Sequence, residues 1–186
     1  MIRNQRDQDA SRRTLIAGAG LFVGAATFAG RAAASPNPAA DVSVMQGALA
    51  LEHEGIAAYR LAGASGLLQA DTLKVALIFK GHHEQHRDAL ADLIRKAGGK
   101  PVEPKADADY VKELNLAALK SQADVVNLAT KLELGATNAY AGQVAALHDP
   151  QLVHLFTQLS ADEAVHWTTL NNAAGTPIPA KAFLFS

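Results

Sequence analysis

The stretch LEHEGIAAY at residues 51–59 returns 81 positions later as LELGATNAY at residues 132–140, with Leu, Glu, Ala and Tyr in matching places. A second pair of segments, HEQH at residues 83–86 and EAVH at residues 163–166, is related by an offset of 80. Similarity at a fixed offset is the sequence signature of a repeated structural unit. The chain therefore contains two copies of one unit, and antiparallel packing of the copies would place equivalent residues around a pseudo-two-fold axis.

Apolar residues around these segments recur every three to four positions, the period of an α-helix, and strand-like alternating runs are almost absent. We expect four main helices, over residues 41–65, 71–97, 118–147 and 150–174. Pro101 and Pro104 interrupt the pattern and indicate a longer middle connection, which includes a short helix over residues 107–116. This order predicts an all-α four-helix bundle made of two helical hairpins joined by a long crossover. An up-and-down bundle with short loops is the structural alternative.

The composition excludes several classes of function. The 186 residues correspond to one ordinary domain, and 17 Lys and Arg against 18 Asp and Glu give a net charge of −1, which offers no basic field for nucleic acid. The sequence contains no Cys, so thiolate zinc sites, iron–sulfur clusters, disulfides and cysteine nucleophiles are excluded. Any bound metal must therefore be held by His and carboxylate side chains.

The first 34 residues have the organisation of an export signal. The pair Arg12-Arg13 stands in a polar start, residues 15–30 form a weakly apolar run, and Ala32-Ala33-Ala34 supplies a small-residue cleavage pattern. The arginine pair resembles the twin-arginine signal of bacteria. It predicts a periplasmic or otherwise exported protein, with its domain over residues 35–186 and no stable membrane span after cleavage. An ordinary Sec signal or a short membrane anchor is the alternative.

Each main helix has an apolar stripe that is interrupted near its middle by polar residues. The interrupting residues are Glu52, His83, His86, Glu133, Glu163 and His166. We expect these side chains to meet inside the bundle, where each ionised carboxylate costs several kcal/mol unless a cation or a hydrogen-bond network compensates it. A metal ion is the simplest compensation. The alternative is a core whose polar groups satisfy one another.

With these residues in place, the chain resembles the ferritin-like superfamily, in which two helices each contribute one Glu and the other two each contribute a Glu-x-x-His pair. It is most similar to exported bacterial ferritin-like proteins, and also to desiccation-related and rubrerythrin-type di-metal carboxylate proteins. By this resemblance Glu52 and Glu133 take the single-Glu positions. One full pair is Glu163 with His166, and His86 is the His of the other pair. The departure is His83, which stands where the family has Glu.

The His83 departure leaves several outcomes open. A carboxylate can bridge two metal ions, whereas a neutral imidazole offers one nitrogen and cannot. The outcomes are an asymmetric di-metal site, a single-metal site, or recruitment of Glu84 or Glu54 through a local π-bulge. The mixed nitrogen and oxygen ligands suit two iron ions, with manganese or zinc as alternatives. In addition, His82 and His86, four residues apart, are a candidate zinc pair on an exposed face.

Tyr59 and Tyr140 lie two turns beyond the single Glu residues on the same helix faces. They are interpreted either as core residues with a bonded hydroxyl or as partners of the ligands in redox chemistry. The apolar tail Phe183-Leu184-Phe185 either covers a bundle end or contributes to a homodimer.

The resemblance implies oxidation of bound metal with reduction of oxygen or peroxide, the activity of a di-iron oxidoreductase of the ferroxidase or peroxidase type. The alternative is a non-catalytic stress or interaction scaffold that keeps the fold with a degenerate or single-metal site, and His83 favours this alternative.

Overall fold

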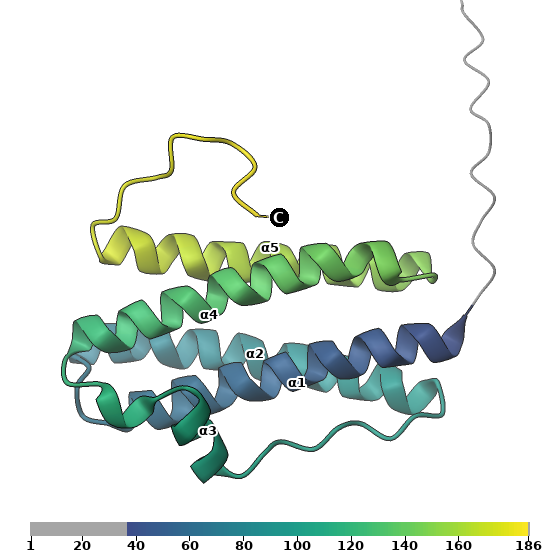
Figure 1. Ribbon diagram of the computed structural model, residues 1–186, viewed down its shortest axis with the longest axis horizontal. Helices are drawn as coiled ribbons and strands as arrows, with labels where there is room; N and C mark the ends of the chain where they lie inside the picture. Colours follow the sequence, from purple (N-terminus) through teal and green to yellow (C-terminus); the bar gives the residue numbers. More distant parts are fainter. Residues whose placement is uncertain (1–36, 186) are drawn as a thin grey trace, which may run out of the picture. The chain divides into compact units, whose positions relative to one another are not determined.

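The computed structural model describes residues 37–185 (Figure 1). The proposed signal peptide and its cleavage site lie outside the described residues, so export stays a prediction. Within residues 37–185, no helix is long and apolar enough to cross a membrane.

The described residues form helices and connecting segments, with no strand among them, which confirms the all-α prediction. The long helices are α1 (Pro38–Gly63), α2 (Ala70–Lys96), α4 (Gln122–Gln143) and α5 (Pro150–Ala173). The middle connection contains the short helix α3 (Asp107–Glu113) and the 3-10 turn η1 (Leu116–Ala118), and a second 3-10 turn, η2 (Val144–Ala146), follows α4.

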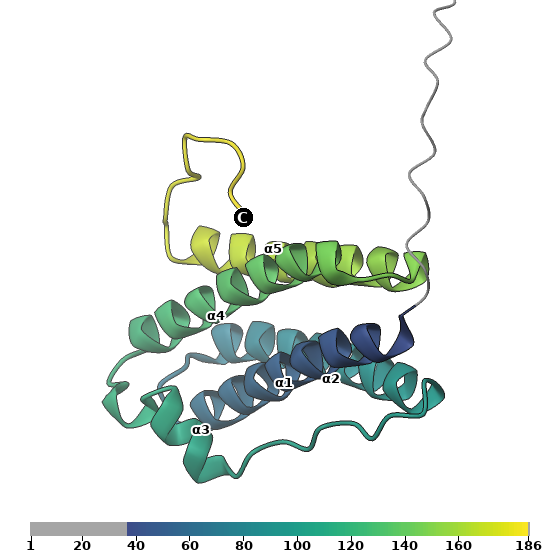
Figure 2. The same ribbon diagram turned by 45° about the vertical axis from the view of Figure 1, so that its right-hand side comes forward.

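The four long helices are arranged as two hairpins. α1 packs chiefly against α2, and α4 packs chiefly against α5. Figures 1 and 2 show the pair α4 and α5 lying over the pair α1 and α2. The segment after α2 runs back along the helices before α4 begins, so α2 and α4 run in the same direction (Figure 1). This is the order of a crossover connection rather than of an up-and-down bundle.

The start of α1 differs from the prediction. The helix begins at Pro38, three residues earlier than expected, because the Asn37 side chain accepts a hydrogen bond from the Ala40 N–H and Pro is favoured in the first turn. Asp41 is buried in this first turn, and its carboxylate accepts hydrogen bonds from the backbone N–H groups of His148 and Asp149. Asp41 thereby fastens the start of α1 to the start of α5.

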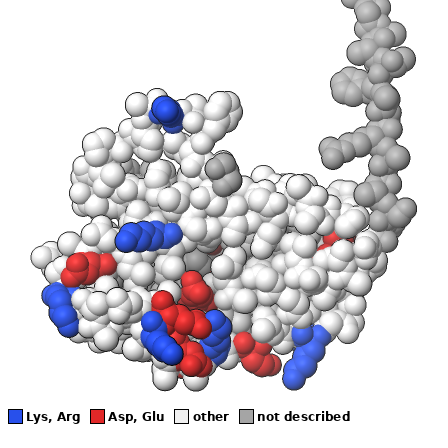
Figure 3. Space-filling model, in the orientation of Figure 1, with Lys and Arg blue, Asp and Glu red and all other residues white. Residues whose placement is uncertain are grey.

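The crossover is fastened to the outer face of α1. The Gln46 side chain donates to the Lys100 carbonyl and accepts from the Val102 N–H, and His53 Nε2 lies 3.1 Å from the Val102 carbonyl oxygen. Further along, Arg60 forms an ion pair with Asp107 of α3. Figure 3 shows charged side chains gathered over this part of the surface. The connection is therefore held in place although it contains little regular structure.

The apolar core is uneven along the helices. At the end where α1 begins, large side chains fill the interior, among them Met45, Leu49, Ile94 and Phe156. At the other end the buried apolar cluster consists of Tyr59, Phe79 and Leu170, with small and β-branched residues against it. The six interrupting polar residues lie between these two clusters.

Candidate metal centre

All four long helices contribute to one buried polar cluster. Its members are Glu52 from α1, His83 and His86 from α2, Glu133 from α4, and Glu163 and His166 from α5. The most exposed of them, His86, has only 8% of its surface accessible. The structure thus brings together all six residues that the interrupted apolar stripes indicated.

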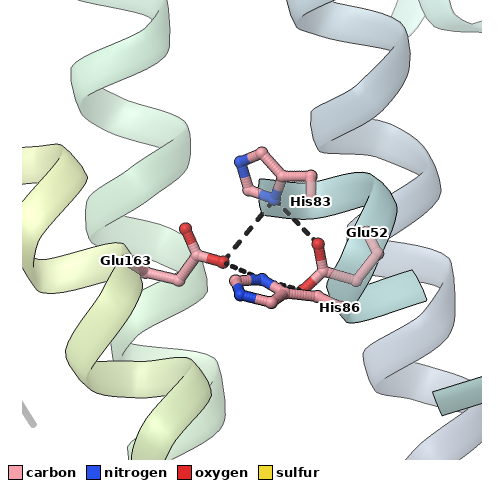
Figure 4. Close-up of side chains that lie close together, drawn as sticks. All are labelled: Glu52, His83, His86 and Glu163. Atoms are coloured by element: carbon pink, nitrogen blue, oxygen red, sulfur yellow. Dashed lines mark hydrogen bonds and ion pairs between the residues drawn. The ribbon is translucent and has the colours of Figure 1, made fainter. Parts of the chain in front are cut away.

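The first half of the cluster consists of Glu52, His83, His86 and Glu163 (Figure 4). His83 Nδ1 lies 2.7 Å from Glu52 Oε2, and His86 Nδ1 lies 3.2 Å from Glu163 Oε1. Each residue offers one ligand atom within 4.8 Å of the others. The four side chains can therefore surround a single metal ion.

The second half consists of His83, Glu133, Glu163 and His166. His83 Nε2 lies 3.4 Å from Glu133 Oε1, and His166 Nδ1 lies 3.0 Å from Glu163 Oε2. Glu163 therefore directs one oxygen to each half, and His83 directs one ring nitrogen to each half. The two halves share two residues, Glu163 and His83, which occupy equivalent positions of the repeat.

A small residue on α1 makes room for His83. A Cβ atom at Gly55 would lie 3.1 Å from the His83 ring, closer than most real contacts of a Cβ. The His83 ring can take its central position because residue 55 has no side chain.

The two tyrosines join the hairpins. The Tyr59 hydroxyl of α1 donates a hydrogen bond to Glu133 of α4, and the Tyr140 hydroxyl of α4 donates to Glu52 of α1. Each tyrosine therefore serves the glutamate of the opposite helix, not the one two turns away on its own helix. These bonds fix one oxygen of each carboxylate, and that oxygen still faces the cluster, since Glu133 Oε1 lies 3.4 Å from His83 Nε2 and Glu52 Oε1 lies 3.5 Å from His86 Nδ1.

Two residues that the sequence analysis missed as partners hold the outer nitrogens of the histidines. His86 Nε2 lies 3.2 Å from Asp162 Oδ2, and His166 Nε2 lies 2.9 Å from His82 Nδ1. Asp162 and His82 occupy equivalent repeat positions, since 162 − 82 = 80. That offset was the signal that could have identified them. Because His82 faces His166 and His86 is buried, the predicted zinc pair on an exposed face is wrong.

The glutamates considered as replacements for His83 lie elsewhere. Glu84 forms an ion pair with Lys80 at the surface, and α2 continues as a regular α-helix through this position. Glu54 is half-buried and lies outside both halves of the cluster. Neither is recruited by a π-bulge.

Comparison with known proteins identifies the fold family. Residues 40–176 match the family model of the ferritin-like domain. The chain belongs to this family. A solved structure of a conserved hypothetical protein from Mycobacterium tuberculosis is similar to this ferritin-like domain, with 22% identity and a TM-score of 0.66 over 78% of this chain and 97% of that chain. No curated protein sequence matches significantly. The resemblance to the ferritin-like superfamily is confirmed.

In the buried cluster of this ferritin-like domain, three carboxylates and three imidazoles lie close enough to change one another's pKa values. Burial alone lowers the pKa of His86, but attraction to Glu163 and Glu52 outweighs it and raises the pKa to about 10. The pKa values of His83 and His166 are also raised against the effect of burial, because Glu133 lies close to both rings. Burial raises the pKa of Glu163 overall. The carboxylates therefore favour the charged imidazolium form of each ring, while burial favours the neutral form of Glu163.

The donor atoms nevertheless fit a metal. Three buried atoms of the cluster, His86 Nδ1, Glu133 Oε2 and Glu163 Oε1, make no hydrogen bond among the described residues. These atoms lie at ion-pair distance from one another or from His166 but make no hydrogen bond, and buried polar atoms without hydrogen bonds at one centre are typical of a ligand set. Mixed imidazole and carboxylate donors suit iron, manganese and zinc.

A small cavity of about 190 Å³ reaches the cluster of the ferritin-like domain from the side of α1 and α4. Its lining includes His83, Glu133 and Tyr59, and also Glu54 and Gly135 toward the outside. Gly135 is exposed, and a Cβ there would meet no atom within 4 Å. The cavity offers a short route for a small molecule or ion to the second half of the cluster.

Proposed function

We propose that this ferritin-like domain binds two metal ions, most suitably iron, in the overlapping halves of its buried cluster and acts as an oxidoreductase. Bound iron or manganese would supply electron transfer to oxygen or peroxide. The observation that carries the proposal is the sharing of Glu163, whose two carboxylate oxygens face different halves. A carboxylate in this position is suited to bridging two ions.

The protein's own residues have three tasks in this proposal. The carboxylates of Glu52, Glu133 and Glu163 neutralise cationic charge in a buried place, which would otherwise be costly. The partners of the outer histidine nitrogens, Asp162 and His82, orient the two rings. The cavity beside α1 and α4 admits a small oxidant and is too small for a large substrate.

One observation favours a second candidate function, a scaffold without catalysis. His83 can direct an N–H group to Glu52 and another to Glu133 when it is protonated. Three imidazolium groups would then balance three carboxylates, and the core would be electrically compensated without metal. A stress or interaction role of the fold would require no ion.

Metal analysis of the protein purified without chelators separates the two functions. We expect close to two iron or manganese atoms per chain, and a lower content in Glu133→Gln and Glu163→Gln, because each substitution removes a charged ligand. Glu84→Gln, which changes a surface glutamate outside the cluster, is the matched control. No metal after reconstitution, or an unchanged content in both cluster variants, would favour the scaffold.

We further propose that the protein is exported by the twin-arginine route, which the pair Arg12-Arg13 supports. Replacement of the pair by Lys-Lys should trap precursor in the cytoplasm, as measured by fractionation and immunoblotting. Normal export of the Lys-Lys protein would instead indicate the Sec route.

A further inference from the structure

A second and larger cavity lies at the end of the helices where α1 ends and α2 begins. It has a volume of about 640 Å³, within the range of about 300–1,000 Å³ that ligand sites occupy. All four long helices line it, and Tyr59 stands between it and the smaller cavity, since this residue lines both. Nothing in the proposed metal chemistry uses this space.

Small side chains create the cavity. Ala58, Ala62, Ala76, Ala129 and Ala173 line it from the four helices, whereas the equivalent interior at the other end is filled by large side chains. Protein interiors are normally close-packed, and unfilled volume costs stability because its lining atoms lose contacts. The hollow opens to solvent at exposed lining residues such as Thr169 and Ala173, and its inner wall is mostly apolar, as a binding site for an apolar molecule requires.

The C-terminal tail does not fill the cavity. The ring of Phe185 packs against Trp167 on α5, with 5.4 Å between ring centroids, and Phe183 is 97% exposed. Figure 1 shows the tail running along α5 rather than across the helix ends. The aromatic residues of the tail are therefore engaged elsewhere or in solvent.

The charges of the lining select the kind of ligand. Its one ionisable group besides Tyr59 is Asp71, at the exposed start of α2, and no Lys, Arg or His is among the residues that line it. The other polar groups are amides and hydroxyls, such as Gln122 and Thr176. An acidic head group would meet the Asp71 carboxylate, and Lys74, the cation beside it, is already paired with Asp71 at 2.9 Å, whereas an uncharged hydroxyl would find hydrogen-bonding groups.

We propose that this cavity binds a neutral, mostly apolar molecule with a small uncharged polar end, of the class of medium-chain alcohols. The apolar part lies among the alanines and Leu170, toward Tyr59, and the polar end lies near Asp71 and Gln122. The binding is independent of any metal, so it can be tested on the metal-free protein and its failure would leave the proposed metal function untouched.

The test is a fluorescence titration of the full chain with N-phenyl-1-naphthylamine, a neutral apolar probe, followed by displacement. We expect saturable binding of about one probe per chain, displacement by 1-decanol, and at least tenfold weaker displacement by decanoate of the same chain length. Absence of saturable binding, or equal displacement by alcohol and carboxylate, would overturn the proposal.

Variants place the binding in this cavity. Ala76→Leu and Ala129→Leu fill the space beside Tyr59 and should reduce probe affinity at least tenfold without lowering Tm, while Ala161→Leu, exposed on α5 outside the cavity, should bind as the parent does. Parent-like affinity in both filled variants would overturn the proposal.

If the filled variants fail to fold, Asp71→Lys provides the deciding test, because the Asp71 side chain is 95% exposed. It should improve decanoate displacement about tenfold, and an unchanged preference would count against the site.

Discussion

Zinc binding to the metal-free protein should release protons from the three clustered histidines. Zinc is a suitable probe because it does not change oxidation state. A histidine must be neutral to bind a metal, yet the pKa values of His83 and His166 are raised and that of His86 is raised to about 10 by the neighbouring carboxylates. The three rings should therefore hold their protons to higher pH than ordinary histidines do, and His86 should hold its proton up to about pH 10.

The magnitude follows from this count. Filling both halves of the cluster should release one proton for each histidine that is protonated beforehand, at most three per chain, and the overall affinity should rise about tenfold per pH unit for each proton released. The rise should flatten as the pH passes the pKa of each histidine, which for His86 is about 10. Tyr59 and Tyr140 do not add to the count while they donate to the glutamates, because burial raises their pKa values further above the ordinary range.

Calorimetry in two buffers of different ionisation enthalpy measures the released protons directly. His154→Gln, which changes an exposed histidine on α5, is the matched control and should leave the count unchanged. Release of fewer than one proton per chain at full zinc occupancy would refute the reasoning, because it would mean that the histidines are neutral in the metal-free core.

The same pKa shifts fix the pH dependence of stability. A histidine whose pKa is raised in the folded state adds stability that is fully present below its unfolded pKa, about 6.5, and is lost as the pH rises through its folded pKa. The metal-free protein should therefore lose stability between pH 7 and about 10, the pKa of His86. The zinc-bound protein should not show this loss, since its histidines are already neutral.

Four further predictions concern single residues. Asp162→Asn should weaken metal binding roughly 10- to 100-fold, measured by competition with a chelator, because it removes the charged partner of a ligand histidine. Gly135→Phe should slow metal loading in stopped-flow measurements with final occupancy unchanged, whereas Gly142→Phe, on the same helix and away from the cavity, should not. Tyr140→Phe should lower the free energy of unfolding of the metal-free protein by about 1–3 kcal/mol in urea titrations, because a buried carboxylate loses its donor. His83→Glu should raise the affinity for the second ion; no gain would mean that another group already bridges.

Much of the fold and of the cluster could be predicted from the repeat. The interrupted stripes identified Glu52 and its five companions because helical period and burial cost are local properties of the sequence. The outer partners were missed although Asp162 and His82 obey the same offset, because which nitrogen of a histidine faces outward is decided by the packing of α2 on α5. The hydrogen bond from each tyrosine to the glutamate of the other hairpin likewise depends on tertiary contact, not on spacing within one helix.

The larger cavity was beyond prediction for a different reason. Alanine is common in helices whatever lies beside it, so Ala62 or Ala129 carries no sign of a void. The void exists because alanines from all four helices fall at the same level, which requires the helix register to be known.

The repeat also explains why His83 matters more than the other ligand-type residues. Its symmetry pairs Glu52 with Glu133, His86 with His166, and Tyr59 with Tyr140, so these residues would give two equivalent halves. Among the ligand residues, the shared pair breaks the symmetry, because Glu163 can give an oxygen to each half, whereas neutral His83 has one lone pair for two. An ion that takes this nitrogen leaves the other half with one fewer ligand. The two halves should therefore differ in affinity through competition for His83, although their other ligands are matched.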